Sequence, residues 1–242
     1  MNPLHIVVLD RDTLVNRPFD FDFPHTLSSY GTTEAHETLE RIRGADIVIT
    51  NKVVISAQAF AENPQLKLVA VTATGVNNVD VEAAKQNGTA VCNIRAYGNE
   101  SVAEHAFMMM ITLMRNLPAY QRDVAAGLWE NSPFFCHLGA PMRDLNGKTL
   151  AIFGRGNIGK TLATYAQAFK MNVVFAEHKN AQSVRDGYVS FDEAIRSADV
   201  VSLNCPLTPQ TANMIGEAEL QQMKPGAILI NCGRGGLVDE AA

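Results

Sequence analysis

The chain has 242 residues, of which 47% are hydrophobic and 19% are charged, and its formal net charge is −5. This hydrophobic fraction can fill the core of one large or two modest domains, and the negative charge argues against nucleic acid as a partner. No stretch reaches the ~18 consecutive apolar residues of a membrane helix, and the first residues lack the features of a signal peptide. We therefore expect a cytoplasmic protein that has no membrane partner.

Short apolar runs alternate with amphipathic segments along the first hundred residues. The runs at 5–9, 46–50, 66–72 and 89–93 are typical of strands buried on both faces. Helical spacing predicts helices at 32–44, 56–63 and 80–88, with Gly44 and Gly88 as C-terminal stops. Strand followed by helix, repeated, predicts a parallel sheet with helices on both faces.

A long apolar helix is predicted at 101–117, closed by Pro118, and an irregular aromatic segment follows at 128–147. A second alternating series then has strands at 148–154, 172–178, 198–204 and 227–231, and helices at 157–169, 191–197 and 217–223. The predicted fold is α/β, with two doubly wound parallel-sheet domains at 1–98 and 99–242.

The four cysteines, Cys92, Cys136, Cys205 and Cys232, lie far apart and form no CxxC pair. Neither a zinc site nor a disulfide framework is indicated by this spacing. We expect reduced thiols and no metal.

The segment GRGNIG runs directly from a predicted strand into a predicted helix and places Gly154, Gly156 and Gly159 in a GxGxxG pattern. The first glycine permits a tight turn, the second lets the backbone approach a diphosphate, and the third lets helix and strand pack closely. Free amides at the start of the helix can then bind the phosphates. A plain tight turn is the alternative, but the flanking strand and helix favour a dinucleotide site.

Glu177 stands at the end of the next predicted strand, eighteen positions beyond Gly159. A carboxylate there can accept hydrogen bonds from ribose hydroxyls and would repel a 2′-phosphate. The sequence therefore favours NAD over NADP. Lys179, if it folded back, would weaken that discrimination.

Arg234 follows a buried apolar run and is flanked by glycines in NCGRGG. From such a position a guanidinium can point into the cleft at the carboxyl end of a parallel sheet, where its paired donors suit a carboxylate or keto oxygen. The alternative is an ordinary surface arginine in a turn.

The chain resembles the D-isomer-specific 2-hydroxyacid dehydrogenases over essentially its whole length. The resemblance rests on ATGVNNVD (73–80), NESVAEHAF (99–107), GRGNIG (154–159), NCPLTPQT (204–211) and INCGRGGLVDE (230–240). Within the family it is most similar to the glycerate dehydrogenase, or hydroxypyruvate reductase, branch. It implies a flavodoxin-like substrate domain, a Rossmann NAD-binding domain and a homodimer.

The resemblance also implies a role for each matching residue. Thr74, Gly75 and Val76 match the loop whose amides receive the substrate carboxylate, and Arg234 matches the catalytic arginine that binds and polarises the substrate. The matching cofactor positions are Gly154, Gly156, Asn157, Ile158, Gly159, Glu177, Cys205, Pro206, Thr211, Cys232 and Gly233.

Hydride transfer to a keto carbon needs a proton donor with a pKa near neutrality, and histidine suits this role. In the family, that histidine and its glutamate partner follow the arginine in sequence. All six histidines of this chain, His5, His25, His36, His105, His137 and His178, precede Arg234. We therefore expect a chain truncated at its C-terminal end, with an incomplete second domain and without the catalytic histidine and glutamate, so that turnover is expected of the parent enzyme rather than of this chain alone.

The expected parent enzyme interconverts a small D-2-hydroxy acid and its 2-keto acid with NADH, and glycerate with hydroxypyruvate, or glyoxylate, are the expected substrates. A protein that binds NAD(H) without turnover, as a sensor or interaction module, is the alternative from a different class. A formate or phosphoglycerate dehydrogenase on the same fold is a third alternative.

Overall fold

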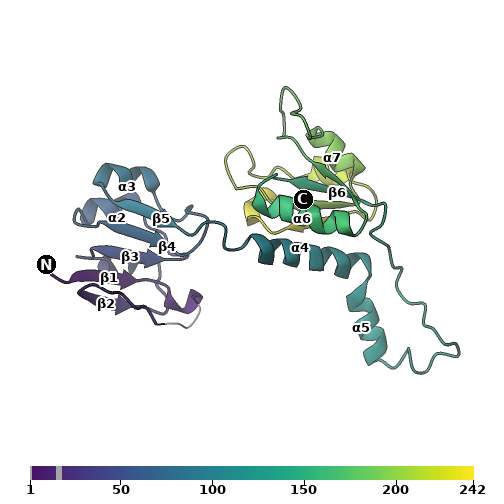
Figure 1. Ribbon diagram of the computed structural model, residues 1–242, viewed down its shortest axis with the longest axis horizontal. Coiled ribbons are helices and arrows are strands. Elements are labelled where there is room, and N and C mark those ends of the chain that lie inside the picture. The colour runs from purple at the N-terminus through teal and green to yellow at the C-terminus, as the bar shows by residue number, and fades with distance from the viewer. Residues whose placement is uncertain (1, 15–17) are drawn as a thin grey trace. The chain divides into compact units, whose positions relative to one another are not determined.

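The computed structural model describes residues 2–14 and 18–242, which separate into two compact units at residues 1–97 and 98–242. Each unit contains a parallel sheet, as the alternating pattern predicts, and the α/β class is confirmed (Figure 1). No helix in the described ranges has both the length and the apolarity needed to cross a bilayer.

The first unit is a parallel sheet with the strand order β2-β1-β3-β4-β5, the flavodoxin-like order. Its strands are β1 (Leu4–Val8), β2 (His25–Ser29), β3 (Ile47–Thr50), β4 (Leu68–Val71) and β5 (Ala90–Asn93). Its helices are α1 (Thr38–Arg41), α2 (Ala57–Glu62) and α3 (Val81–Asn87), and a 3-10 turn spans Arg11–Thr13. The buried core includes Val7, Val48 and Phe60.

Strand β2 was not expected from the sequence, because HTLSS carries no apolar pattern. It pairs with β1 alone and forms an edge of the sheet, where all five of its residues are exposed or half-buried. An edge strand of this kind needs no apolar run.

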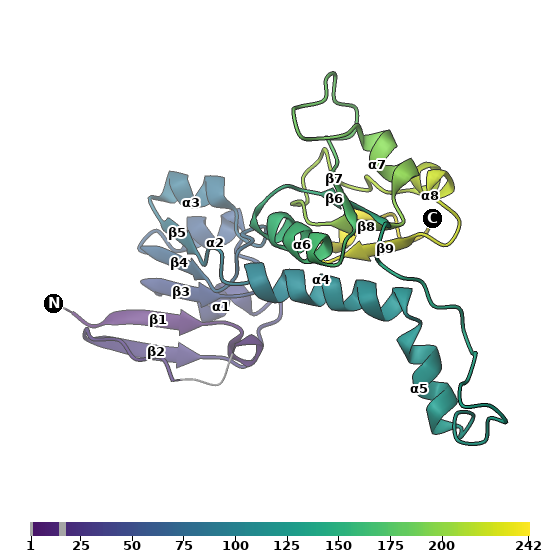
Figure 2. The same ribbon diagram turned by 45° about the vertical axis from the view of Figure 1, so that its right-hand side comes forward.

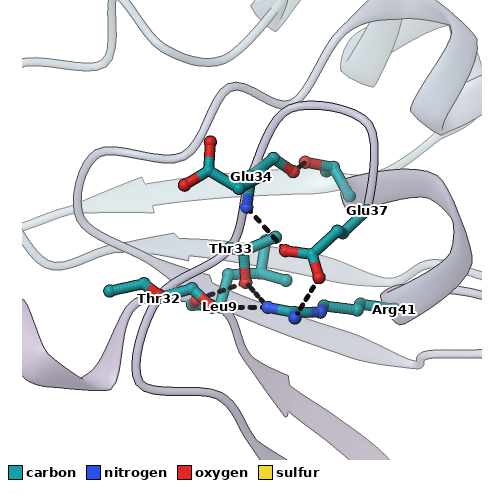
Figure 3. A network of polar contacts seen from close by, with 7 residues as sticks. Leu9, Thr32, Thr33, Glu34, Glu37 and Arg41 are labelled. Carbon is teal, nitrogen blue, oxygen red and sulfur yellow. Dashed lines mark hydrogen bonds and ion pairs between the residues drawn. The ribbon is translucent and has the colours of Figure 1, made fainter.

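The helix predicted at 32–44 is mostly wrong, since α-helix is limited to Thr38–Arg41. A side-chain network holds the preceding residues in an irregular turn (Figure 3). The Arg41 guanidinium donates to Thr33 Oγ1 at 2.7 Å and to Glu37 Oε1 at 2.6 Å, and the Thr33 hydroxyl donates to the Leu9 carbonyl. These bonds offer the segment an alternative to a further helical turn, as threonine side chains that bond to the backbone often do.

The second unit begins with α4 (Asn99–Met114) and α5 (Leu117–Ala125). Its sheet has the order β7-β6-β8-β9, from β6 (Thr149–Phe153), β7 (Asn172–Phe175), β8 (Val200–Leu203) and β9 (Ile228–Asn231). The remaining elements are α6 (Asn157–Ala168), α7 (Phe191–Ser197), α8 (Glu217–Gln222) and a 3-10 turn at Gly235–Leu237. A parallel bridge between Ala176 and Val189 extends the β7 edge.

Helix α4 lies along α6 in both views of the ribbon (Figure 1, Figure 2). Ala103, Ala106, Met110 and Met114 are buried there together with Leu162 and Ala166 of α6. Alanines allow the two helices to approach closely, and each buried methionine contributes about 1.5–3 kcal/mol. This packing holds α6, and with it the glycine turn before it, against the sheet.

The long helix predicted at 101–117 ends earlier than expected. Helix α4 stops at Met114, Asn116 adopts a left-handed conformation with φ of 50°, and α5 starts at Leu117 with Pro118 in its first turn. Proline suits the first turn of a helix because its missing N–H would have no partner there. Pro118 therefore belongs to the start of the unpredicted α5.

Candidate functional site

A cavity of about 620 Å³ lies in the second unit at the carboxyl ends of β6, β7 and β8. Its lining includes Phe153 and Gly154 after β6, Ala176 and Glu177 after β7, and Asn204 after β8. Ligands of open α/β sheets bind at this edge, where the connections leave on opposite sides. The cavity is therefore the candidate cofactor site.

The three glycines of the turn between β6 and α6 meet three different constraints. Gly154 has φ of 111°, and a Cβ there would lie 2.7 Å from the Asn204 carbonyl oxygen. A Cβ on Gly159 would lie 2.1 Å from the Gly154 carbonyl oxygen, so α6 packs directly on the turn. A Cβ on Gly156 would meet no described atom within 4 Å. Open space beside Gly156 is what a bound diphosphate requires.

The start of α6 offers free backbone donors beside this open space. Gly156 precedes the helix, and no side chain within the described ranges caps it. The first amides of a helix have no intrahelical acceptor, and they carry the positive end of the helix dipole. Asn157 is exposed and Ile158 is half-buried at these positions. The turn therefore fits a dinucleotide diphosphate.

Glu177 is 3% exposed at the cavity wall and is held in an ion pair. Arg185 Nε donates to Glu177 Oε2 at 2.7 Å, and Arg185 Nη2 donates to Oε1 at 2.7 Å. Hydrogen bonds from Arg185, then from the amide of His178, lower the pKa of Glu177 from its ordinary 4.5 to about 2. The carboxylate is therefore charged at neutral pH and already has a cationic partner.

Lys179 lines the same cavity but turns toward α8. Its Nζ lies 2.7 Å from Glu219 Oε1 and donates to the Met214 carbonyl at 3.1 Å. Lys179 therefore does not fold back toward the end of β7, which was the alternative that the sequence left open.

The loop after β8 forms another wall of the cavity through Cys205, Pro206 and Thr211. The Thr211 hydroxyl donates to the Pro206 carbonyl at 2.7 Å and accepts from the Thr208 amide at 2.8 Å, which closes the loop on itself. Burial raises the pKa of the Cys205 thiol, so this sulfur is neutral at physiological pH.

Arg234 lies just beyond β9, in a loop clamped by Asn231. Asn231 Oδ1 accepts from the Gly233 amide at 3.0 Å, and Asn231 Nδ2 donates to the Arg234 carbonyl at 2.8 Å. A Cβ on Gly233 would lie 3.2 Å from the Cys205 carbonyl oxygen, so this loop packs against the cavity wall. The Arg234 side chain is exposed and forms no ion pair within the described residues.

In the first unit, the loop after β4 carries Thr74, Gly75 and Val76. Asn93 Nδ2 donates to the Thr74 carbonyl at 2.7 Å and fixes the loop to β5. The amides of the three loop residues donate to no acceptor in the described part of the chain. Free amides at the carboxyl end of a parallel sheet can bind an anionic group.

The predicted cofactor residues divide into two groups. Gly154, Gly156, Glu177, Cys205, Pro206 and Thr211 line the cavity. The other five do not line it: Asn157, Ile158 and Gly159 lie in the first turn of α6, and Cys232 and Gly233 lie in the loop after β9. Sequence reasoning missed Arg155, Arg185 and Tyr188, which also line the cavity. No motif marks Arg185, whose pairing with Glu177 depends on how the loop between them folds.

Comparisons with known proteins agree with this geometry. Residues 107–242 match the family model for the D-isomer specific 2-hydroxyacid dehydrogenase NAD binding domain. The chain is 42% identical over 244 residues to a putative 2-hydroxyacid dehydrogenase of Haemophilus influenzae, covering 99% of this chain and 76% of that protein. It is 42% identical over 238 residues to a glycerate dehydrogenase of Methylorubrum extorquens, covering 98% of this chain and 74% of that protein.

Among solved structures, a glyoxylate reductase from Paecilomyes thermophila is similar with a TM-score of 0.78 and 28% identity, covering 100% of this chain and 77% of that one. This structural similarity and the sequence matches indicate a 2-hydroxyacid dehydrogenase, and the glycine turn and the cavity fit the dinucleotide site of such an enzyme. The chain therefore belongs to the D-isomer-specific 2-hydroxyacid dehydrogenases, a family of NAD-dependent oxidoreductases.

Proposed function

We propose that the whole enzyme to which this chain belongs reduces a small 2-keto acid, hydroxypyruvate or glyoxylate, to the corresponding D-2-hydroxy acid with NADH. The observation that carries the proposal is the turn from β6 into α6, where Gly156 leaves open space beside uncapped helix amides at the edge of a large cavity. The similarity to a glycerate dehydrogenase and a glyoxylate reductase supports the substrate class.

In this proposal the dinucleotide supplies the hydride, and the second unit binds and orients it. The turn residues Gly154 and Gly156, with the α6 start formed by Asn157, Ile158 and Gly159, bind the diphosphate. The adenosine ribose lies beside Glu177, and the loops of Cys205, Pro206 and Thr211 and of Cys232 and Gly233 follow the rest of the cofactor. Burial raises the pKa of both cysteine thiols, so they supply apolar contact rather than charge.

Substrate recognition is assigned to Arg234 and to the loop of Thr74, Gly75 and Val76. The Arg234 guanidinium is exposed and free of carboxylate partners in the described chain, so it can bind a carboxylate and polarise a keto oxygen. The free amides of the loop offer further donors for the substrate carboxylate.

NADH is the preferred cofactor in this proposal, because a carboxylate just after the second strand of the nucleotide-binding sheet, as at Glu177, is the feature that favours NAD over NADP in this type of fold. A 2′-phosphate would place a second negative charge beside it.

Steady-state reduction of hydroxypyruvate, glyoxylate and pyruvate by the whole enzyme, followed by the loss of NADH absorbance, tests the proposal. We expect turnover with the first two and a titratable NADH site. Tight NADH binding without turnover of any keto acid would instead favour a cofactor-binding sensor, and failure to bind NADH would reject the dinucleotide site itself.

We propose a homodimer, supported by the exposed apolar side chains that follow α5. Trp129, Phe134, Phe135 and Leu138 are 51%, 73%, 99% and 89% exposed, and both views show α5 and the following segment extending away from the sheet of the second unit (Figure 1, Figure 2). Large exposed apolar surfaces commonly mark interfaces. Light scattering should give twice the chain mass, and Phe135→Asp should give a monomer.

A cytoplasmic location is proposed as well. The four cysteines, Cys92, Cys136, Cys205 and Cys232, form no disulfide in the described structure, as suits a reducing compartment. Cell fractionation tests this location.

A further inference from the structure

The carboxylate of Glu177 has all its acceptor positions occupied by the protein. Oε2 accepts from Arg185 Nε and from the Arg185 amide, at 2.7 and 3.2 Å. Oε1 accepts from Arg185 Nη2 and from the His178 amide, at 2.7 and 2.8 Å. Two hydrogen bonds per oxygen approach the capacity of a carboxylate.

This ion pair changes the electrostatics at the adenosine end of the cavity. A lone carboxylate repels a 2′-phosphate, but Glu177 and Arg185 together carry no net charge. Arg185 is 54% exposed on its side chain and lines the cavity, whereas Glu177 is 3% exposed. The cation of the pair is therefore the more accessible partner for an anion entering from solvent.

A second guanidinium lies at the same end. Arg155, inside the glycine turn, places its guanidinium carbon 4.9 Å from the Phe175 ring centroid and 5.3 Å from that of Tyr188. Arg185 lies 4.2 Å from the same Tyr188 ring, so one aromatic side chain contacts both cations. Arg155 forms no ion pair with any residue of the described ranges.

The backbone leaves room for Arg155 in this position. Gly187 has φ of 74°, and a Cβ there would lie 2.9 Å from Arg155 Nη1. A side chain at 187 would therefore be strained and would displace the guanidinium. Lys179 adds nothing to this pair of cations, because its Nζ is paired with Glu219.

We propose that Arg185 and Arg155 make the adenosine end of the cavity accept a 2′-phosphate, so that the site binds NADPH in addition to NADH. Arg185 is then a residue that determines cofactor specificity. Arg185 cancels the repulsion from Glu177, and Arg155 supplies paired donors that suit a phosphate. The affinity for NADH then exceeds the affinity for NADPH by only a small factor. This inference rests on the proposed function only in that a dinucleotide occupies the cavity.

Two fragments that differ by the 2′-phosphate alone, 5′-AMP and 2′,5′-ADP, test the proposal without any catalytic step. Isothermal titration of the full chain should give dissociation constants within about tenfold of each other. Arg155→Met should weaken 2′,5′-ADP about tenfold and leave 5′-AMP within about twofold. Arg196→Met, an exposed arginine on α7 that does not line the cavity, is the matched control and should change neither constant.

Arg185→Met leaves the Glu177 charge without its partner and should weaken 2′,5′-ADP about tenfold or more, with 5′-AMP retained. The double variant Glu177→Gln with Arg185→Met removes both charges and should restore 2′,5′-ADP binding. A loop that had merely lost its structure would not be rescued in this way.

Discrimination of more than about a hundredfold against 2′,5′-ADP by the unaltered protein would overturn the inference. An unchanged ratio of the two constants in Arg185→Met, or no rescue in the double variant, would do the same. If neither fragment nor NADH binds, the dinucleotide site itself is wrong. Binding of 5′-AMP with exclusion of 2′,5′-ADP removes this inference alone.

Discussion

The carbonyl oxygen of Gly154 lies 2.1 Å from the point where a Cβ on Gly159 would be placed. Helix α6 therefore packs on the turn before it with no room for a methyl group. Beside it, Gly156 has open space in the described structure. One motif thus contains a glycine required for packing and a glycine required for access.

These two glycines should respond differently to the same substitution. Gly159→Ala should lower the free energy of unfolding by about 1–3 kcal/mol, because the added methyl group forces α6 away from the turn. Gly156→Ala should leave stability nearly unchanged and weaken NADH binding about tenfold or more, because its methyl group occupies the diphosphate space. Urea denaturation and NADH fluorescence titration measure the two effects. Equal stability losses in both variants would contradict this division.

In the whole enzyme, Arg234→Ala should lower kcat/KM for hydroxypyruvate about a hundredfold or more, because truncation of the side chain removes the charged donors for the substrate. The dissociation constant for NADH should change little, since Arg234 does not line the cavity. Arg196→Ala on α7 is the surface control. Turnover of Arg234→Ala equal to that of the control would remove Arg234 from the substrate site.

Asn93→Ala should raise KM for the keto acid several-fold while NADH affinity stays the same. The Asn93 side chain donates to the Thr74 carbonyl, and its loss frees the loop whose amides are assigned to the substrate. Steady-state kinetics with varied keto acid, beside an NADH titration, separates the two effects. A fall in NADH affinity with constant KM would argue against this role for the loop.

The ion pair of Glu177 should stabilise the fold in a pH-dependent way. Its pKa is lowered in the folded protein, so its contribution is complete above the ordinary pKa of 4.5 and is lost as the pH falls toward about 2. The difference in thermal midpoint between the unaltered protein and Glu177→Gln should therefore shrink across this range. Asp192→Asn, in an exposed pair on α7, is the control. A difference independent of pH would show that Glu177 is not ionised in the fold.

In the whole enzyme, Glu177→Gln should also narrow the ratio of kcat/KM for NADH over NADPH, because the substitution leaves the Arg185 guanidinium without its carboxylate partner and free to attract a 2′-phosphate. Kinetics with both cofactors at fixed hydroxypyruvate measure the ratio. An unaltered ratio would exclude Glu177 from cofactor choice.

The sequence predicts most of the fold because buried parallel strands are apolar runs with little ambiguity. The central strands β3, β4, β6 and β8 lie within the predicted segments, and β1 begins one residue before the segment predicted for it. The sequence does not predict the edge strand β2, because a strand that pairs on one side only needs no apolar pattern. It does not predict α5 either, because Pro118 is interpreted there only as the end of the preceding helix.

The candidate site was predictable where a short motif carries the chemistry, as in the glycine turn. The sequence predicts Glu177 at the end of a strand as a ribose contact, and in the structure it lines the cavity, but nothing in the sequence predicts its ion pair with Arg185. The pairing with Arg185 arises from the fold of the loop between them, and neither spacing nor composition encodes it. Asn231 and Asn93 likewise act through contacts that appear only once the strands are assembled.

The central claim is that the turn from β6 into α6 binds a dinucleotide diphosphate. A crystal structure of the protein with NADH tests it most directly. We expect diphosphate oxygens at about 3 Å from the amides of Asn157 and Ile158, with the adenosine ribose beside Glu177. NADH bound elsewhere, with the space beside Gly156 empty, would contradict it.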